Sequence, residues 1–223
     1  MFIKVAEFGA LPRKAKQVKL VFISGYLITL AVLTGNLSIS EAREVRSLLE
    51  MRHEKVIIQK WDISCGAAAL ATLLNYQHGD RVSEKEVAQS LMKRDSYIKH
   101  PGLVTLRQGF SILDLKRYVN SRGYRGIGYG NLDFKEIINH APAIVPIRIH
   151  GYNHFVIFRG VRGNRVLLSD PAWGNRTVTV DRFKDSWIDY PQLGHVGFVV
   201  LSRDGLNPPN QLSPREEDFV MLR

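Results

Sequence analysis

Cys65 is the only cysteine in the 223-residue sequence, and it opens a segment with strong helical character. A single thiol forms no internal disulfide and builds no cysteine-based zinc site. Its remaining roles are a small buried apolar residue or a reactive nucleophile. The segment CGAAALATLLNY is rich in alanine and leucine, which favour a buried helix. The N–H groups at a helix start stabilise a thiolate, although a buried core cysteine is the commoner case when no other residue is considered.

His154 and Asp170 supply what a cysteine nucleophile needs, which is a base and a group that orients the base. They lie in the segment HFVIFRGVRGNRVLLSD, where two apolar runs flank a turn around Gly163. In an antiparallel hairpin the start of one strand meets the end of its partner. We therefore expect the imidazole and the carboxylate to lie side by side at one edge of a sheet, with the second ring nitrogen facing the thiol.

Gln59 lies six residues before Cys65, and its side-chain amide is a candidate donor to a developing oxyanion. The backbone N–H of Cys65 is a second candidate. His150 and His154 have an i, i+4 spacing, but on a strand this separates them by about 13 Å, which is too far to share a metal ion. We expect no metal and no cofactor.

The elements that must position these residues change character along the chain. Helical spacing or composition marks the segments 41–52, 65–76, 83–94, 111–122 and 133–139. Ser83 and Glu86 have the spacing of a capping box. Asp62 or Ser64 is expected to cap the helix that begins at Cys65.

From residue 143 onward, β-branched and aromatic runs predict strands instead. These strands are 143–149, 155–161, 166–169, 177–180 and 196–201. Pro146 has no backbone N–H and therefore suggests an edge strand or a bulge in the first of them. Helices followed by a mainly antiparallel sheet predict an α+β fold with two lobes packed on each other.

Residues 1–40 have the pattern of a targeting segment. A basic stretch precedes the uncharged run LVFISGYLITLAVL, and no charge follows until Glu41. This predicts a secretory signal peptide, with Ser38 and Ser40 in a cleavage site and Glu41 as the first mature residue. An uncleaved signal anchor is the alternative, because a tilted helix could extend through Gly35. Both interpretations predict an exported, periplasmic or extracytoplasmic protein, held at the membrane only in the second.

The formal net charge of +10 owes much to this segment. Without residues 1–40, which hold five bases and one acid, the chain carries 26 bases and 20 acids with no dense basic tract. Nucleic acid is therefore not an expected partner. We expect residues 41–202 to form the domain. The stretch 203–223 contains Pro208, Pro209 and Pro214 and several charges, and is expected to be a poorly ordered polar tail.

The chain resembles the bacteriocin-processing peptidase family, the papain-like cysteine peptidases that remove double-glycine leaders. The resemblance rests on QKWDISCGAAAL around Gln59 and Cys65, on NHFVIF around His154 and on SDPAWG around Asp170. It implies a papain-like two-lobed fold with Cys65 as the nucleophile and His154 as the general base and acid. It also implies that Asp170 orients the histidine and that Gln59 donates to the oxyanion.

Two departures from the family pattern are visible. An acidic residue often precedes the family's cysteine, where this chain has Ser64, and many members form part of a transporter whose nucleotide-binding motif this chain lacks. We therefore expect a stand-alone, exported cysteine-type peptidase whose substrate is a peptide or protein, such as a component of a secretion or surface assembly. One alternative is a non-catalytic module that binds an extended peptide at the sheet edge near Pro146. Another is a transpeptidase or amidase that uses the same triad.

Overall fold

The computed structural model describes residues 46–106 and 108–222. The chain divides into two units, residues 1–45 and 46–223, and the described residues all belong to the second. The predicted signal segment, its cleavage site and the mature start at Glu41 lie outside the described residues. Within the described ranges, no helix has both the length and the apolar character needed to cross a bilayer.

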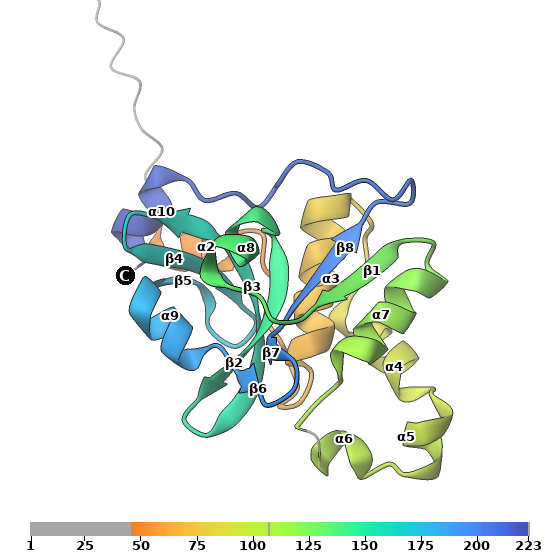
Figure 1. Ribbon diagram of the computed structural model, residues 1–223. Coiled ribbons are helices and arrows are strands. Elements are labelled where there is room, and N and C mark those ends of the chain that lie inside the picture. Colours follow the sequence, from red (N-terminus) through yellow and green to blue (C-terminus); the bar gives the residue numbers. More distant parts are fainter. Residues whose placement is uncertain (1–45, 107, 223) are drawn as a thin grey trace, which may run out of the picture. The chain divides into compact units, whose positions relative to one another are not determined.

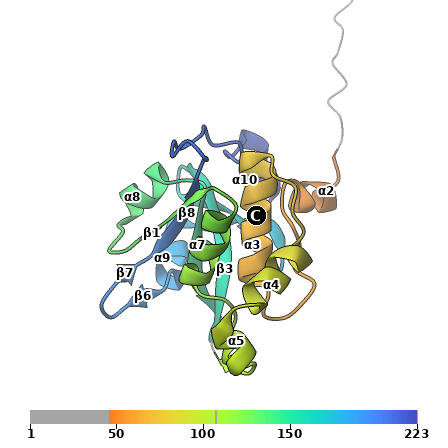
Figure 2. The same ribbon diagram turned by 90° about the vertical axis from the view of Figure 1, so that its right-hand side faces the viewer.

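Helices make up most of the first part of this unit. They are α2 (Leu48–His53), α3 (Cys65–His78), α4 (Glu84–Met92), α5 (Asp95–Lys99), α6 (Leu103–Leu106) and α7 (Ile112–Ser121). The helix α3 is central because every residue from Cys65 to Leu74 is buried, as its composition predicted. Both α4 and α7 pack against it (Figure 2).

The expected capping box of α4 is only half formed. The Ser83 hydroxyl accepts the Glu86 N–H at 3.1 Å, as predicted. The Glu86 carboxylate does not return the bond and instead contacts the guanidinium of Arg122 at 3.4 Å. A complete box occurs in α7, where Ser111 and Asp114 bond each other's backbone N–H groups.

A six-stranded antiparallel sheet forms the second part (Figure 1). Its strands are β1 (Arg125–Tyr129), β2 (Ala143–Ile149), β3 (Tyr152–Arg162), β4 (Arg165–Asp170), β5 (Gly174–Thr179) and β8 (Gly197–Leu201), in the order β1-β8-β2-β3-β4-β5. The remaining elements are α8 (Phe134–Asn139), α9 (Val180–Ser186), the two-stranded pair β6 (Asp189–Tyr190) and β7 (Gly194–His195), and α10 (Glu216–Met221). The predicted α+β class is confirmed, although β1, with two glycines in five residues, was not predicted as a strand.

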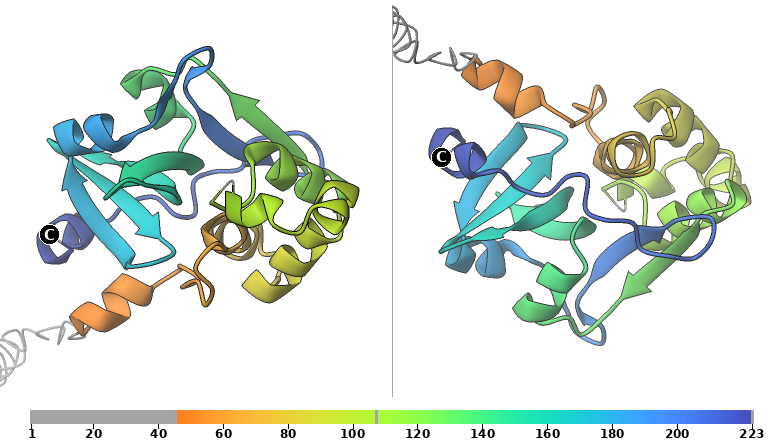
Figure 3. Two further views of the ribbon diagram at one scale, coloured as in Figure 1. Left: turned by 90° about the horizontal axis from the view of Figure 1, so that it is seen from below. Right: turned by 90° about the horizontal axis from the view of Figure 1, so that it is seen from above.

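The sheet separates two apolar cores because successive strand residues point to opposite faces. Ile144 and Ile157 belong to the core that contains α3, α4 and α7. Their neighbours Val145 and Val156 belong to the core on the other face, together with Phe183 of α9. Figure 3 shows α3 and α9 on opposite sides of the strands.

Pro146 does not mark an edge strand, as the sequence suggested. Its strand β2 lies inside the sheet and pairs with β3 along its whole length. On its other side β2 pairs with β8 only at Ile144, so Pro146 lies beyond the point where β8 has diverged. The missing N–H therefore costs no ladder bond there, and the Pro146 carbonyl accepts the N–H of Ile188 at 3.1 Å.

The expectation of a poorly ordered tail from residue 203 is wrong. Leu212 is fully buried in the core around α3, and Phe219 of α10 is buried beside Leu167 of β4. The Leu222 carbonyl accepts the Thr177 N–H at 2.7 Å, on the free edge of β5. Proline and charge content suggested disorder, but a few spaced apolar residues bind the segment to the domain.

We expect Leu212→Ala to lower the free energy of unfolding by about 2–5 kcal/mol, because it leaves a cavity in the core. Leu206→Ala is the matched control, since Leu206 lies in the same segment but is 66% exposed. Urea denaturation of both variants measures the difference. Equal stabilities would contradict the packing of this segment.

Candidate active site

The helix α3 carries Cys65 to the sheet. Cys65 is the first residue of α3, and its side chain is 4% exposed. The next residue, Gly66, faces Phe155 of β3, where a Cβ atom at Gly66 would lie 3.3 Å from Cδ2 of the ring. A side chain at this position would therefore crowd the Phe155 ring. The glycine therefore allows the start of α3 to approach the beginning of β3, which carries His154.

Ser64 does not cap α3 with its side chain, contrary to expectation. Its hydroxyl oxygen lies within hydrogen-bond distance of two acceptors instead, the Trp61 carbonyl at 2.7 Å and Oε1 of Glu84 at 2.5 Å, which share its single proton. The buried Glu84 carboxylate also accepts the Lys60 N–H with both oxygens, at 3.0 and 3.1 Å. Glu84 therefore holds the loop that leads from Gln59 to Cys65, a role that no local pattern of the sequence indicates.

His154 and Asp170 meet as the hairpin spacing predicted. Ile157 of β3 pairs with Ser169 of β4, and Asp170 is the last residue of β4. The first residues of β3, which include His154, therefore extend beyond the end of β4 and lie near Asp170. His154 Nε2 lies 2.6 Å from Oδ1 of Asp170. Since Nε2 is engaged by the carboxylate, Nδ1 is the ring nitrogen left for another partner.

The Cys65 thiol lies close enough to His154 to hydrogen-bond with its side chain, and it affects the charge of the ring. Burial disfavours the imidazolium, but hydrogen bonds with Asp170 and Cys65, together with the negative charges of both groups, raise the pKa of His154 to about 9. At neutral pH the imidazole is therefore protonated, and it lies between two acidic groups. A protonated imidazole is the form of the histidine that a cysteine nucleophile requires beside it.

Arg176 is a member of the site that the sequence analysis missed. Its Nε lies 2.9 Å from Oδ2 of Asp170, while the Ala172 N–H binds Oδ1 at 2.9 Å. Burial opposes ionisation, but His154, Arg176 and Ala172 together lower the pKa of Asp170. Leu168 pairs with Arg176 across the β4–β5 hairpin, which puts Arg176 diagonally beside Asp170. If SDPAWGNR is taken as a turn between two strands, the sequence alone predicts this contact.

Gln59 lies close to Asp170 through its backbone. Its N–H donates to the carbonyl of Pro171, directly after Asp170, at 2.8 Å. Its side-chain Nε2 donates to the Trp61 carbonyl at 2.9 Å and reaches the Asp62 carbonyl only at 3.5 Å. Its Oε1 is buried without a hydrogen-bond partner among the described residues. The amide therefore has one well-made bond and a second N–H that is only weakly engaged.

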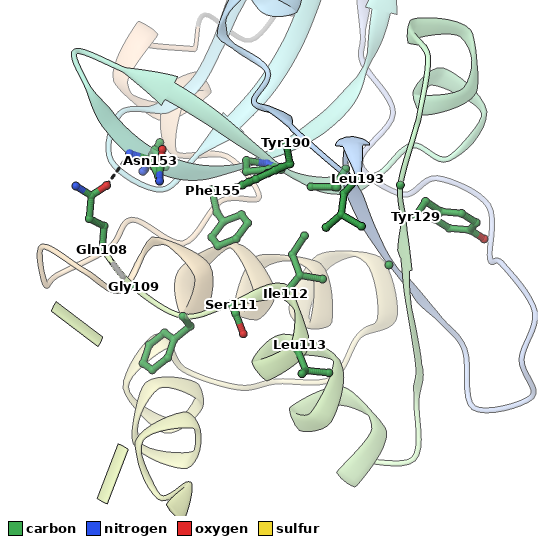
Figure 4. A pocket seen from close by; sticks show the side chains of 16 residues that line it. Gln108, Gly109, Ser111, Ile112, Leu113, Tyr129, Asn153, Phe155, Tyr190 and Leu193 are labelled. Carbon is green, nitrogen blue, oxygen red and sulfur yellow. Dashed lines mark hydrogen bonds between the residues drawn. The ribbon is translucent and has the colours of Figure 1, made fainter. Parts of the chain in front are cut away.

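A mostly apolar pocket of about 560 Å³ opens beside His154. Figure 4 shows Phe155, Ile112, Leu113, Tyr190 and Leu193 around it, and a hydrogen bond between Gln108 and Asn153 at its margin. That bond, from the Asn153 N–H to Oε1 of Gln108 at 3.2 Å, ties the helical part to the start of β3. An apolar recess that includes this imidazole suits an apolar group of a bound ligand.

Comparison with known proteins identifies the family of the chain. Residues 53–191 match the Peptidase C39 family. The probable functional amyloid protease FapD of Pseudomonas aeruginosa is 39% identical over 183 residues, which span 78% of this chain and 74% of that protein. The protein of the same description from Pseudomonas fluorescens is 34% identical over 145 residues, 65% of this chain and 62% of its own length.

Solved structures share the fold. A double glycine motif protease from an AMS/PCAT transporter, crystallised with the leader peptide, matches with a TM-score of 0.52 at 22% identity and covers 66% of this chain and 89% of its own. The peptidase domain of Streptococcus ComA matches with a TM-score of 0.53 at 17% identity, covering 67% and 98%. At these identities the likeness concerns architecture.

We expect Asp170→Asn to move the pKa of His154 down from about 9, because the variant removes the charge that offsets burial. NMR titration measures this shift, with His154→Gln used to assign the resonance. The stabilisation that protonated His154 contributes is complete below pH 6.5 and is lost as pH rises through about 9. An unchanged His154 titration in Asp170→Asn would contradict the coupling.

Proposed function

The chain belongs to the Peptidase C39 family and is a cysteine-type peptidase, and we propose that Cys65 is its nucleophile. In this proposal His154 is the general base and acid, and Asp170 orients the imidazole and stabilises its protonated form. The supporting observation is the hydrogen-bonded position of His154 between the thiol and the buried carboxylate. Arg176 and Ala172 hold that carboxylate in place from its other sides.

The reaction follows from these positions. The thiolate attacks the peptide carbonyl, an S–C bond forms, and the carbonyl electrons move to oxygen. The imidazolium then gives its Nδ1 proton to the leaving nitrogen as the C–N bond breaks. Water attacks the resulting thioester with His154 as the base, which releases a carboxylic acid and restores the thiolate. Asp170 stays ionised and stabilises the charged ring throughout.

Gln59 is proposed as an oxyanion donor. Its tie to Pro171 places it between the cysteine loop and the end of β4. The amide N–H that only reaches the Asp62 carbonyl at 3.5 Å is free to turn to a stronger acceptor such as an oxyanion. Glu84 supports this role because it holds Lys60 and Ser64 on either side of the intervening loop.

We propose that the substrate is a polypeptide of a functional amyloid system outside the cytoplasm. The relatives that cover most of the domain are described as probable functional amyloid proteases. The basic and then apolar pattern of residues 1–33 fits export of this chain. The same triad would serve acyl transfer to an amine, and mass spectrometry of the products separates this alternative from hydrolysis.

The alternative of a non-catalytic module that binds a peptide at the sheet edge near Pro146 is not supported by the strand order. Strand addition there requires an open sheet edge, whereas β2 is paired with β3 and reaches β8. A bridge between Ile147 and Trp187 and the bond from Ile188 to Pro146 occupy part of the remaining side. An extended peptide therefore has no continuous edge to join at this strand.

We expect iodoacetamide to modify Cys65 rapidly near neutral pH, and about tenfold or more slowly in His154→Ala, because the imidazolium stabilises the thiolate. Mass spectrometry follows the reaction without ambiguity, since Cys65 is the only cysteine. His100→Ala is the control for loss of an exposed histidine elsewhere. Modification of the wild type at the rate of an ordinary thiol would count against the proposed pair.

Incubation with a peptide library should give cleaved products with the wild-type chain and none with Cys65→Ala, which removes the proposed nucleophile. Circular dichroism checks that the variant is folded. The products report the preferred sequence at the same time. Cleavage that persists in Cys65→Ala would remove Cys65 from the mechanism.

Gln59→Ala should lower kcat about 10²–10³-fold on the best library peptide, because one oxyanion donor is lost. Lys60→Ala is a neighbouring control, since its contact with Glu84 uses only the backbone N–H. KM should change much less than kcat. An unaltered kcat in Gln59→Ala would assign the oxyanion to other donors.

A further inference from the structure

A second recess, which we call the arginine groove, lies on the face of the sheet that carries α9. It has a volume of about 520 Å³, and it is built from the end of β2 with its turn, from β4 and β5, from α9 and from one residue of α2. Its basic lining residues are Arg52, Arg148, His150, Arg176 and Arg182. The mechanism proposed above uses Arg176 and leaves the others without a role.

The charge of the arginine groove is one-sided. None of its lining residues is acidic, although the described chain has many carboxylates. Among the described residues, the side chains of Arg52, Arg148 and Arg182 form no ion pair, while Arg176 is paired with Asp170. Unpaired guanidinium groups gathered around one hollow create a positive potential that attracts carboxylates.

The floor of the groove is apolar. Ile147 and Leu168 are buried beneath it, Ile149 and Val178 are half-buried, and Trp173 is 68% exposed at its margin. Trp173 therefore does not anchor a core and is available for contact from outside. An apolar floor with a guanidinium rim suits a segment whose acidic side chains alternate with apolar ones.

We propose that the arginine groove is an exosite that binds an acidic, partly apolar segment of the polypeptide substrate, away from the bond that is cleaved. The proposal rests on the peptidase function proposed above. A polypeptide fits better than a nucleic acid or a lipid surface, because the floor accepts aliphatic side chains and the cationic residues surround a confined hollow rather than an extended face.

The groove and the triad share a residue. Arg176 lines the groove and also binds Oδ2 of Asp170, so the groove lies directly beside the proposed triad. The turn of β2 and β3 joins the two sites as well, because Arg148 and His150 line the groove and His154 follows on β3. A single substrate chain is therefore well placed to occupy both.

The test uses the full-length chain with Cys65→Ala, which binds without cleaving. The probe is a short fluorescein-labelled peptide in which glutamates alternate with leucines, compared with the same peptide carrying glutamine for glutamate. Fluorescence anisotropy should show the glutamate peptide binding more tightly at low salt. The double variant Arg148→Gln, Arg182→Gln should weaken its affinity about tenfold.

The double variant Arg117→Gln, Arg125→Gln is the matched control, because it removes two exposed arginines from α7 and β1 and gives the same net charge. It should bind the glutamate peptide as Cys65→Ala alone does. Three outcomes would overturn the proposal. The first is equal affinity for the two peptides, and the second is an equal loss of affinity in both double variants. The third is arginine-dependent binding only to phosphatidylglycerol vesicles or to a single-stranded oligonucleotide.

A kinetic measurement then connects the groove to cleavage. The best library peptide is extended with the glutamate–leucine sequence, and the extension should lower KM several-fold in the wild type but not in Arg148→Gln, Arg182→Gln, with kcat unchanged. A KM that the extension leaves unaltered in the wild type contradicts the exosite. If no peptide is cleaved at all, the proposed catalytic function fails. The anisotropy measurement still shows whether the arginine groove binds an acidic peptide.

Discussion

The buried contact between His154 and Asp170 is the interaction on which the site depends. The Asp170 side chain is completely buried, and an ionised carboxylate in such a place is costly unless each oxygen has partners. One oxygen meets His154 and the Ala172 N–H, and the other meets Arg176. Because these partners come from β3, the turn after β4, and β5, the sheet must be assembled before the charge is tolerated. The charge state of the imidazole therefore depends on the assembled sheet.

The helical part places the Cys65 thiol near that imidazole. Alanine and glycine at the start of α3 permit the close approach, and Phe155 of β3 packs on Gly66. Glu84 then fixes the loop before the helix through Lys60 and Ser64. A carboxylate from α4 thus reaches the serine that directly precedes the cysteine. Buried, hydrogen-bonded carboxylates thus fix both the loop before Cys65 and the end of β4.

The turn between β2 and β3 organises what surrounds the reactive groups. Pro146 and the residues from Asn153 to Phe155 line the apolar pocket, while Ile147 to His150 line the arginine groove. His150 and Gly151 both have positive φ, which matches the tight two-residue turn between the paired Ile149 and Tyr152. One hairpin thus contributes to two recesses of opposite character, one apolar and one basic.

Local pattern was sufficient for the parts of the site that are close in sequence. The composition of α3 located Cys65 at a helix start, and the hairpin spacing placed His154 beside Asp170, because both depend on short-range geometry. Only the tertiary structure decided the contacts of Glu84, the interior position of β2 and the burial of Leu212. These join residues far apart along the chain, where composition predicts polarity or disorder but cannot say which distant groups will satisfy a carboxylate or cover a leucine.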